Sequence, residues 1–476
     1  MHNGSELYRF GPFELDPART LLTRDGQSVA VAKRPFDLLA FLVAHAGEVV
    51  RKETLVKAVW DGVIGESSID RAIWSLRRIL GSRPDGTPYI ETLKRVGYRF
   101  AAPVERTHVR PAIDIDELLA PLESLSDSRA ALDTLGHEAI VRAHETLDDA
   151  VRSAPGSAEA HVEMAMACVL RFEATRIDSA PDVASLQEAI RHALAGCQLD
   201  PSSGGAWSAL GLALHRTGHT RSALAAARKA VGLEPDVARH YMRLAFVSWG
   251  DECLSAVRRI LLLYPDLAIP HWLAVRVFIA RGALEPAMEH LRAGCAAQDA
   301  QRSRETSRFE AVGLHLQRGL VLATQGADDD ARAAFARELT FEQEGQVYAR
   351  ECAANTLYSA GALDLRCGRR VDAEGRFRQA LIRVPGHPLA IVGLRALGVS
   401  APDPTNETNI VDAAMTRAAA LALAGAHDEA ARTFADALAS AQPGPDGWLL
   451  PVEPLINAAA HPGVWASVFE TLRHRA

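Results

Sequence analysis

Apolar residues between Glu66 and Leu80 recur every three or four positions, which is the spacing of one face of an α-helix. The apolar stripe consists of Ile69, Ile73, Leu76 and Leu80. The opposite face carries Arg71, Trp74, Ser75 and Arg78. Ser67 or Ser68 can cap the first turn. The pattern predicts a short helix, anchored on one side, that presents two arginines, a serine and an indole on the other.

Two interpretations fit this helix. In the first, it is an amphipathic surface helix with a solvated basic face. In the second, it enters the major groove of DNA, where an arginine can donate two hydrogen bonds to a guanine edge. The segments on either side of the helix favour the second interpretation.

Four short runs of strand-forming residues open the chain. They lie at residues 8–10, 13–15, 20–23 and 29–31. The dipeptides Gly-Pro, Asp-Pro and Asp-Gly separate them, and Asp-Gly is a strong signal for a β-hairpin. We expect a small antiparallel sheet of about four strands.

Two helices and a terminal hairpin complete this region. The sequence predicts a buried helix over residues 35–46, a second helix over residues 51–60, and a hairpin from residues 89–93 and Gly97–Phe100. Lys94 and Arg95 lie near the tip of that hairpin. These elements define a first domain at residues 1–104, and a proline-containing acidic stretch at 105–129 predicts a linker with room for one short helix.

From about residue 130 to 476 the chain reads as helix after helix, with a repeat near 34 residues. The clearest copy, residues 204–237, has Trp207 and Gly211 in a first helix, Gly218 at the turn, and Ala227 in a second helix. Small residues at the helix crossing let two backbones approach. We expect about eight such helix pairs, so the chain is multidomain and mainly α.

Composition narrows the function classes. Residues 1–104 hold 15 lysines and arginines against 12 acids, a charge of +3, while the remainder carries −10. A mildly basic N-terminal region followed by an acidic remainder fits nucleic-acid binding by the N-terminal region. No apolar run suits a membrane span and the N-terminus does not resemble a signal peptide, so we expect a cytoplasmic protein.

Catalytic, metal and cofactor motifs are not evident. The six cysteines are widely spaced, without CxxC or a histidine at metal-binding spacing, and we expect them to be reduced. No phosphate-binding, zinc-protease or serine-hydrolase motif is found. The sequence therefore predicts no catalytic residues, no metal, no cofactor and no enzyme.

The first hundred residues resemble the winged-helix DNA-binding domain of the OmpR/PhoB type. The resemblance rests on LLAFLV, RKETLVKAVW, SIDRAIWSLRRILG and YIETLKRVGYRF, within residues 7–103. It is similar in particular to the CadC/ToxR-like branch and to HilA-like regulators, which lack a receiver domain. It implies a small sheet, three helices and a C-terminal β-hairpin wing.

The resemblance also implies site residues, because in this family the third helix enters the major groove and the wing reaches the adjacent minor groove. Recognition-helix positions are Ser68, Arg71, Trp74, Ser75 and Arg78. Wing positions are Lys94 and Arg95, and phosphate contacts are Arg51, Lys52 and Arg77. Other members often have arginine where this chain has Trp74 and Ser75, so the target sequence should differ. Trp74 either contacts DNA or packs against the wing.

Partners follow from the same resemblances. The winged helix implies double-stranded promoter DNA and a homodimer on paired half-sites, and residues 61–66 correspond to a loop that contacts RNA polymerase in some members. The helical region resembles a tetratricopeptide repeat (TPR) solenoid, which implies a protein, peptide or small effector. Candidate groove residues are His161, Arg243, Trp272, Arg276, His315, Arg318 and Tyr358.

We therefore expect a sequence-specific transcription regulator, by analogy an activator, whose solenoid binds an effector or dimerises. Two alternatives stay open. One is an interaction scaffold whose degenerate winged helix binds no specific DNA. The other is a SARP-type regulator, distinguished by direct-repeat spacing in its DNA.

Overall fold

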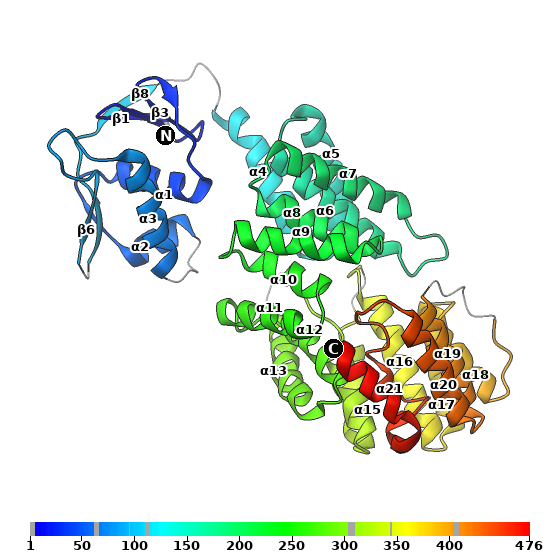
Figure 1. Ribbon diagram of the computed structural model, residues 1–476. Coiled ribbons are helices and arrows are strands. Elements are labelled where there is room, and N and C mark those ends of the chain that lie inside the picture. The colour runs from blue at the N-terminus through cyan, green and yellow to red at the C-terminus, as the bar shows by residue number, and fades with distance from the viewer. Residues whose placement is uncertain are drawn as a thin grey trace. The chain divides into compact units, whose positions relative to one another are not determined.

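The computed structural model describes residues 5–60, 66–94, 96–109, 115–302, 310–342, 345–402 and 409–476. The chain divides into two compact units, Met1–Leu122 and Glu123–Ala476, called here the N-terminal unit and the helical unit (Figure 1). The N-terminal unit combines two sheets with three helices, and the helical unit is a long run of paired helices.

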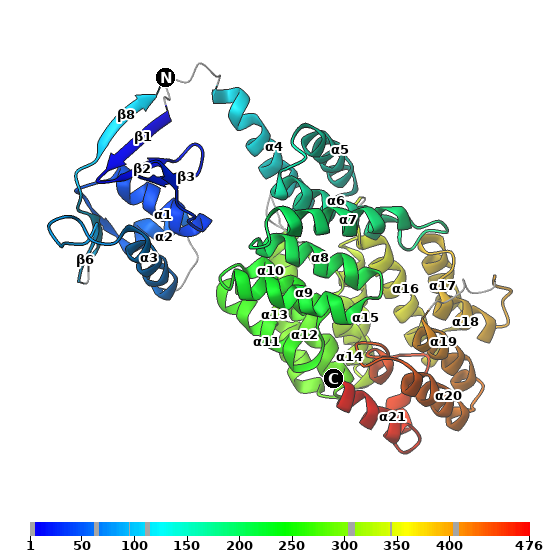
Figure 2. The same ribbon diagram turned by 45° about the horizontal axis from the view of Figure 1, so that its top comes forward.

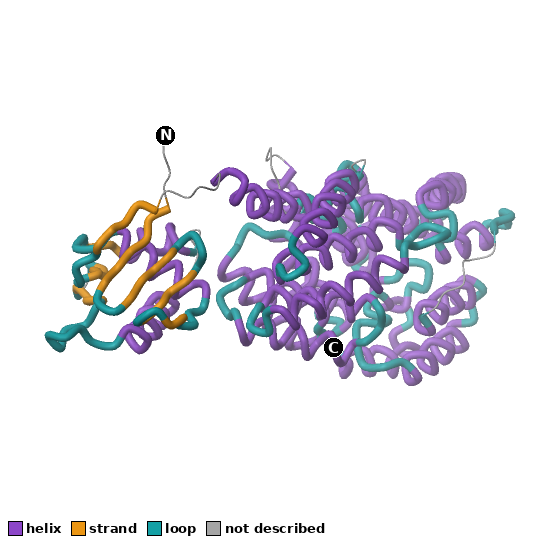
Figure 3. The backbone as a smooth tube through the Cα atoms, turned by 90° about the horizontal axis from the view of Figure 1, so that it is seen from above, coloured by secondary structure: helices purple, strands orange, loops and turns teal. Residues whose placement is uncertain are grey.

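The N-terminal unit holds the strands of the described chain, drawn in orange in Figure 3. One sheet has the antiparallel order β4-β3-β2-β1-β8, and the other has the order β5-β7-β6. The strands are β1 (Ser5–Phe10), β2 (Phe13–Asp16), β3 (Leu21–Arg24), β4 (Gln27–Ser28), β5 (Val49–Arg51), β6 (Ile90–Leu93), β7 (Gly97–Phe100) and β8 (Glu105–Val109).

Three helices pack with these sheets around one hydrophobic core (Figure 2). They are α1 (Lys33–Ala44), α2 (Lys52–Val59) and α3 (Glu66–Leu80). Alternate residues of β2 point inward, so Phe13 and Leu15 are buried beside Phe10 of β1. The ring of Phe10 meets those of Tyr89 and Phe100 at steep angles, with centroids 5.9 and 4.9 Å away. This core joins the first sheet to the terminal hairpin.

The structure of this unit differs from two sequence predictions and adds one strand that was not predicted. The strand expected at residues 29–31 is instead the two-residue β4, which ends at Ser28. Strand β5 pairs with β7 and was not predicted, because it is only three residues long. The segment expected to be a linker contains β8, which pairs with β1, and the 19-residue helix α4 (Ile115–Asp133). Pairing with an open sheet edge satisfies the backbone of a segment whose own sequence has weak strand character.

The helical unit continues with α5 to α20, two short 3₁₀ turns and α21. Helices α5 to α11 are α5 (His137–Ser153), α6 (Ala158–Thr175), α7 (Val183–Leu199), α8 (Gly204–Arg216), α9 (Thr220–Leu233), α10 (Ala238–Val247) and α11 (Gly250–Leu263). Helices α12 to α17 are α12 (Ile269–Ala280), α13 (Leu284–Arg302), α14 (Leu314–Thr324), α15 (Asp328–Leu339), α16 (Ala349–Arg366) and α17 (Arg370–Arg383). The last elements are α18 (Pro388–Ala396), α19 (Ile410–Leu423), α20 (His427–Ser440), η1 (Leu450–Val452), η2 (Ala458–Ala460) and α21 (Pro462–Arg475).

Successive helices pack as TPR-like pairs. The pairs are α6/α7, α8/α9, α10/α11, α12/α13, α14/α15, α16/α17 and α19/α20. The sequence predicts about eight pairs; seven are found in the described residues, because α4 and α5 do not pack together as a pair. Within these residues no helix is both long enough and apolar enough to cross a bilayer.

Glycine at the helix crossing explains why the pairs form where they do. A Cβ atom on Gly211 of α8 would lie only 3.0 Å from the carbonyl oxygen of Ala223 in α9. In the α14/α15 pair, the ring of Phe335 covers Gly319, and in the α16/α17 pair Phe377 covers Gly361. The small residue and the large one together fill the space between two helices.

Segments far apart in sequence close the helical unit. The guanidinium of Arg176, at the end of α6, forms a bidentate ion pair with Glu351 in α16. The backbone at Gly136 bridges to Gln346. At the other end, Arg281 donates to the backbone oxygen of Ala476, the last residue of the chain. The solenoid is therefore tied together by contacts that its local repeat does not specify.

We predict that Gly319→Ala destabilises the helical unit, because the new methyl group would lie 2.4 Å from the buried ring of Phe335. Overpacking of this kind costs about 1–3 kcal/mol. The matched control is Gly375→Ala in α17, where a Cβ atom would meet nothing within 4 Å and removing a helical glycine should stabilise by about 0.5–1 kcal/mol. Urea unfolding of the full chain measures both changes, and equal stability of the two variants would contradict the explanation.

Candidate nucleic-acid interface

Helix α3 has one buried and one exposed face. Ile69, Ile73, Leu76 and Leu80 are all at most 2% exposed and belong to the core of the N-terminal unit. On the other side Arg71, Trp74 and Arg78 are exposed, and Ser75 is half-buried. The predicted helix and its two faces are therefore present in the structure, and the exposed face is available to a ligand.

Trp74 is the most exposed aromatic residue on this face, with 60% of its surface accessible. The guanidinium carbon of Arg78 lies 5.2 Å from the centre of the Trp74 ring, one turn along the helix. Of the two sequence interpretations of Trp74, burial against the wing is therefore not what the structure shows. The exposed indole and the guanidinium beside it suit stacking on sugars, bases or thymine methyl groups.

Asp70 fixes α3 against its neighbours. The hydroxyl of Tyr98 in β7 donates a hydrogen bond to the Asp70 carboxylate. The ammonium of Lys52, the first residue of α2, lies 3.6 Å from the same carboxylate oxygen. One carboxylate thus ties the start of the exposed helix to the second sheet and to α2, which sets the direction of the residues beside it. Sequence reasoning did not single out Asp70 or Tyr98.

Arg77 joins α3 to the terminal hairpin. Its Nε and Nη2 atoms donate to the carbonyl oxygen of Ile90 at 3.0 and 2.8 Å, and Nη2 also donates to the Thr92 hydroxyl at 2.7 Å. Three hydrogen bonds of Arg77 therefore go to β6, and the phosphate contact predicted for Arg77 stays a prediction. This arginine holds the helix and the hairpin side by side.

The terminal hairpin is a tight pair of strands that carries Lys94 at its turn. Strands β6 and β7 pair from Ile90 with Phe100 to Leu93 with Gly97. Lys94 is exposed, and Arg95 lies outside the described residues. A Cβ atom at Gly97 would lie 1.9 Å from the carbonyl oxygen of Val50, so glycine is required for β5 and β7 to approach. The wing predicted from sequence is thus anchored on both sides.

Of the other residues predicted to contact DNA, some are exposed and some are partly or fully buried. Arg51 is exposed at the end of β5, whereas Lys52 is half-buried in its ion pair with Asp70. Ser68 is only 7% exposed, which corrects its predicted place on the DNA-facing side. Since α3 begins at Glu66, Ser68 lies within the first turn and not at the N-cap. The loop at residues 61–65, expected to contact RNA polymerase, lies outside the described residues.

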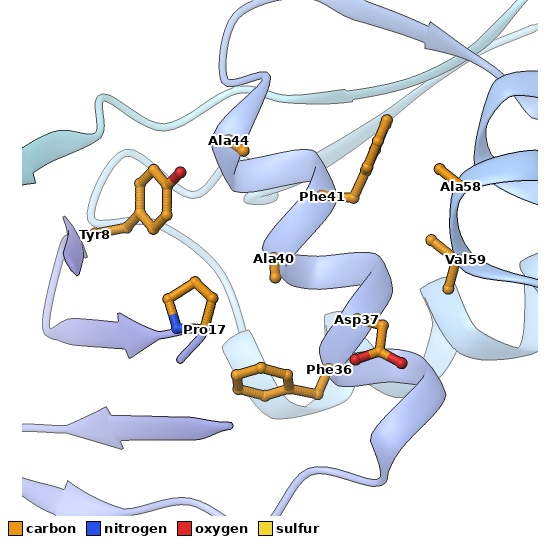
Figure 4. Close-up of a pocket in the computed structure, with 9 residues that line it drawn as sticks. All are labelled: Tyr8, Pro17, Phe36, Asp37, Ala40, Phe41, Ala44, Ala58 and Val59. Atoms are coloured by element: carbon orange, nitrogen blue, oxygen red, sulfur yellow. The ribbon is translucent and has the colours of Figure 1, made fainter. Parts of the chain in front are cut away.

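A pocket of about 280 Å³ lies elsewhere in the N-terminal unit (Figure 4). Its walls come from β1, the turn after β2, α1 and α2: Tyr8, Pro17, Phe36, Asp37, Ala40, Phe41, Ala44, Ala58 and Val59. Partial burial raises the pKa of the Asp37 carboxyl. None of the predicted DNA-contacting residues lines this pocket, so it is separate from the exposed face of α3.

The candidate groove residues of the helical unit are largely engaged within the unit. His161 contacts His192, and His315 contacts Asp299 at 3.1 Å. The C-terminal segment, defined as residues 448–457, crosses the first helices of three pairs. In it, Trp448 stacks on Arg276 of α12, and Glu453 accepts a hydrogen bond from Tyr358 of α16.

This C-terminal segment is buried where it crosses those helices. Val452 belongs to the hydrophobic core formed by α12 and α14, and Glu453 is 1% exposed. Burial raises the pKa of Glu453 to about 7 and lowers that of Arg276 to about 10. The surface that the repeat pattern offers to a partner between α12 and α16 is therefore covered by the chain itself.

Comparisons with known proteins decide the class of the N-terminal unit. Residues 26–100 match the family described as "Transcriptional regulatory protein, C terminal". The chain is 41% identical over 101 residues to the transcriptional regulator HilA of Salmonella typhimurium, and 30% identical over 100 residues to the transcriptional activator CadC of Escherichia coli. This region is an OmpR/PhoB-type DNA-binding domain.

The alignments with HilA and CadC cover only the OmpR/PhoB-type domain. The alignments cover 21% of this chain, 18% of HilA and 20% of CadC, so the chain matches about a fifth of the length of these relatives. The solved DNA-binding domain of E. coli CpxR is 33% identical, covering 20% of this chain and 95% of that chain with a TM-score of 0.19. The family is one of transcription regulators and not of enzymes.

We predict that Arg77→Met and Arg78→Met differ sharply in stability. Loss of the Arg77 hydrogen bonds to β6 should lower the free energy of unfolding of the OmpR/PhoB-type domain by about 1–2 kcal/mol, since a carbonyl is left unpaired. Arg78 is exposed, so its replacement should change stability by less than about 0.5 kcal/mol. Hydrogen exchange at the amides of β6 and β7 in the full chain measures the difference. Equal protection in the two variants would contradict the role given to Arg77.

Proposed function

We propose that this protein is a sequence-specific transcription regulator that reads promoter DNA with the exposed face of α3. The observation that carries the proposal is that Arg71, Trp74 and Arg78 are exposed on a helix whose opposite face is locked in the core. Such a helix fits the major groove, and each arginine can discriminate guanine by about 1–3 kcal/mol.

The wing supports the same proposal. Arg77 holds the hairpin beside α3, so Lys94 at its turn can reach the backbone of the adjacent groove while α3 reads the bases. Arg51, Lys94 and Arg95 are proposed as backbone contacts, which position the domain without specifying sequence. A regulator that binds promoter DNA has to be in the same compartment as the chromosome, so the cytoplasm is the proposed location.

The helical unit is proposed to bind an effector or a second copy of the chain. A solenoid of helix pairs offers large surfaces of the kind that bind proteins and peptides. Since the C-terminal segment covers α12, α14 and α16, a partner would bind other helices or displace that segment. Dimerisation would match paired half-sites about one helical turn apart. Activation is proposed by analogy with the transcriptional activator CadC, and contact of residues 61–66 with RNA polymerase is proposed as its route.

A scaffold role is the second candidate, in which the OmpR/PhoB-type domain docks a protein. The modest charge of +3 over residues 1–104 and the exposure of Trp74 favour it. Selection of genomic fragments by the purified full chain separates the two. Enrichment of one sequence at physiological salt supports the regulator, whereas retention only at low salt, without sequence preference, supports the scaffold.

We predict that the double variant Arg71→Ala, Arg78→Ala loses specific binding to the enriched fragment by at least about 100-fold, because two side chains that reach base edges are removed. Both positions are exposed, so the thermal unfolding midpoint should stay nearly unchanged. DNase footprinting is the measurement, with Arg9→Ala, an exposed arginine of β1, as the control. An unaltered footprint with the double variant would refute the proposed readout.

We predict a different effect for Lys94→Ala. Loss of one phosphate contact should weaken binding to specific and non-specific DNA by a similar factor, and the slope of log affinity against log salt should flatten by about 1. Titrations at several salt concentrations measure both quantities, with Lys57→Ala in α2 as an exposed control. A loss limited to the specific site would mean that Lys94 reads bases instead.

A further inference from the structure

Three side chains of metal-binding type meet in the helical unit although they are far apart in sequence. His144 of α5, Cys168 of α6 and Glu188 of α7 each bring one donor atom within 4.8 Å of the other two. These three residues are called here the His-Cys-Glu cluster. The sequence offers no metal motif at this spacing, because the cluster forms only when three helices pack.

The donors suit one class of ion. A thiolate sulfur, an imidazole nitrogen and a carboxylate oxygen are the ligands that zinc prefers. At the usual zinc bond lengths of about 2.0–2.3 Å, tetrahedral ligands lie roughly 3.5 Å from one another. The donor atoms therefore have to approach one another by about 1.3 Å at most, which side-chain rotation can supply.

The helices that carry the cluster are packed together, and one side of the cluster is accessible to an ion from solvent. Helices α6 and α7 form one tightly packed pair, and α5 packs on α6. Cys168 is fully buried, whereas His144 and Glu188 are half-buried and reach solvent. A metal site needs packed helices that hold its ligands in place and a solvent-exposed side through which the ion can enter, and the cluster has both.

One cation competes with a metal at this place. The Nη1 atom of Arg171 lies 3.0 Å from Nε2 of His144, and its Nη2 atom lies 3.2 Å from a carboxylate oxygen of Asp182. A bound ion would displace the guanidinium from the imidazole, while the pair with Asp182 can persist. Two anionic ligands, the thiolate and Glu188, would balance the charge of the ion.

Loading also exchanges a proton. Burial raises the pKa of the Cys168 thiol to about 12 and lowers the pKa of His144, so the metal-free cluster holds a protonated thiol and a neutral imidazole at pH 7. The ion binds the thiolate, so the thiol proton leaves to solvent when the sulfur–metal bond forms.

We propose that the His-Cys-Glu cluster is a Zn²⁺ site, with Cys168 Sγ, a ring nitrogen of His144 and a carboxylate oxygen of Glu188 as ligands and water in the fourth position. The ion would cross-link α5 to the first helix pair. The solenoid thereby gains a metal-responsive element, independent of whether the N-terminal domain reads specific DNA.

The test uses Co²⁺ as a spectroscopic substitute for zinc on the full chain, with the exposed Cys367 replaced by serine in every sample. We expect one Co²⁺ per chain, a sulfur-to-cobalt charge-transfer band, and its loss when Zn²⁺ is added. Cys168→Ser should abolish the band, and His144→Gln should weaken Co²⁺ binding at least about tenfold. Cys197→Ser, a buried cysteine of α7 outside the cluster, should leave it intact.

Arg171→Met supplies a test in the opposite direction, since removing the competing cation should tighten Co²⁺ binding. Circular dichroism confirms the fold of each variant, and if Cys168→Ser is unfolded, the His144 and Arg171 variants decide. A chain that shows no charge-transfer band, a band that survives Cys168→Ser in a folded protein, or unchanged affinity in both other variants would overturn the proposal.

Discussion

The burial of one face of α3 is the constraint on which the N-terminal domain depends. Ile69, Ile73, Leu76 and Leu80 fill its core, and each buried side chain of this type contributes about 1.5–3 kcal/mol. Successive residues of a helix are about 100° apart, so a rotation that exposed Arg77 in place of Arg78 would also expose part of this stripe. The four buried residues of α3 therefore determine which of its other residues are exposed to solvent.

Polar contacts also hold α3 in position. Asp70 connects α3 to Tyr98 and Lys52, and Arg77 connects it to the backbone of β6. These contacts join the helix to the second sheet, and thus hold the exposed face of α3 beside the terminal hairpin. The three arginines of α3 consequently differ. The side chains of Arg71 and Arg78 are exposed, whereas that of Arg77 binds the backbone of β6.

The helical unit follows another rule, in which small residues at helix crossings set the distance between paired helices. Gly319 and Gly361 admit the rings of Phe335 and Phe377, and the same arrangement recurs along the chain. Repetition alone would leave an open solenoid. The C-terminal segment and ion pairs such as Arg176 with Glu351 close it, so its inner helices contact other parts of the same chain.

The sequence by itself determined α3, its two faces and the terminal hairpin, because helical periodicity and turn residues are local properties. It also determined the run of helix pairs, since the glycine and alanine spacing repeats. Only the tertiary structure decided that Ser68 is buried, that Arg77 binds β6, that β8 completes the first sheet, and that His144, Cys168 and Glu188 converge. Each of these depends on which distant segments meet, and no local pattern encodes that.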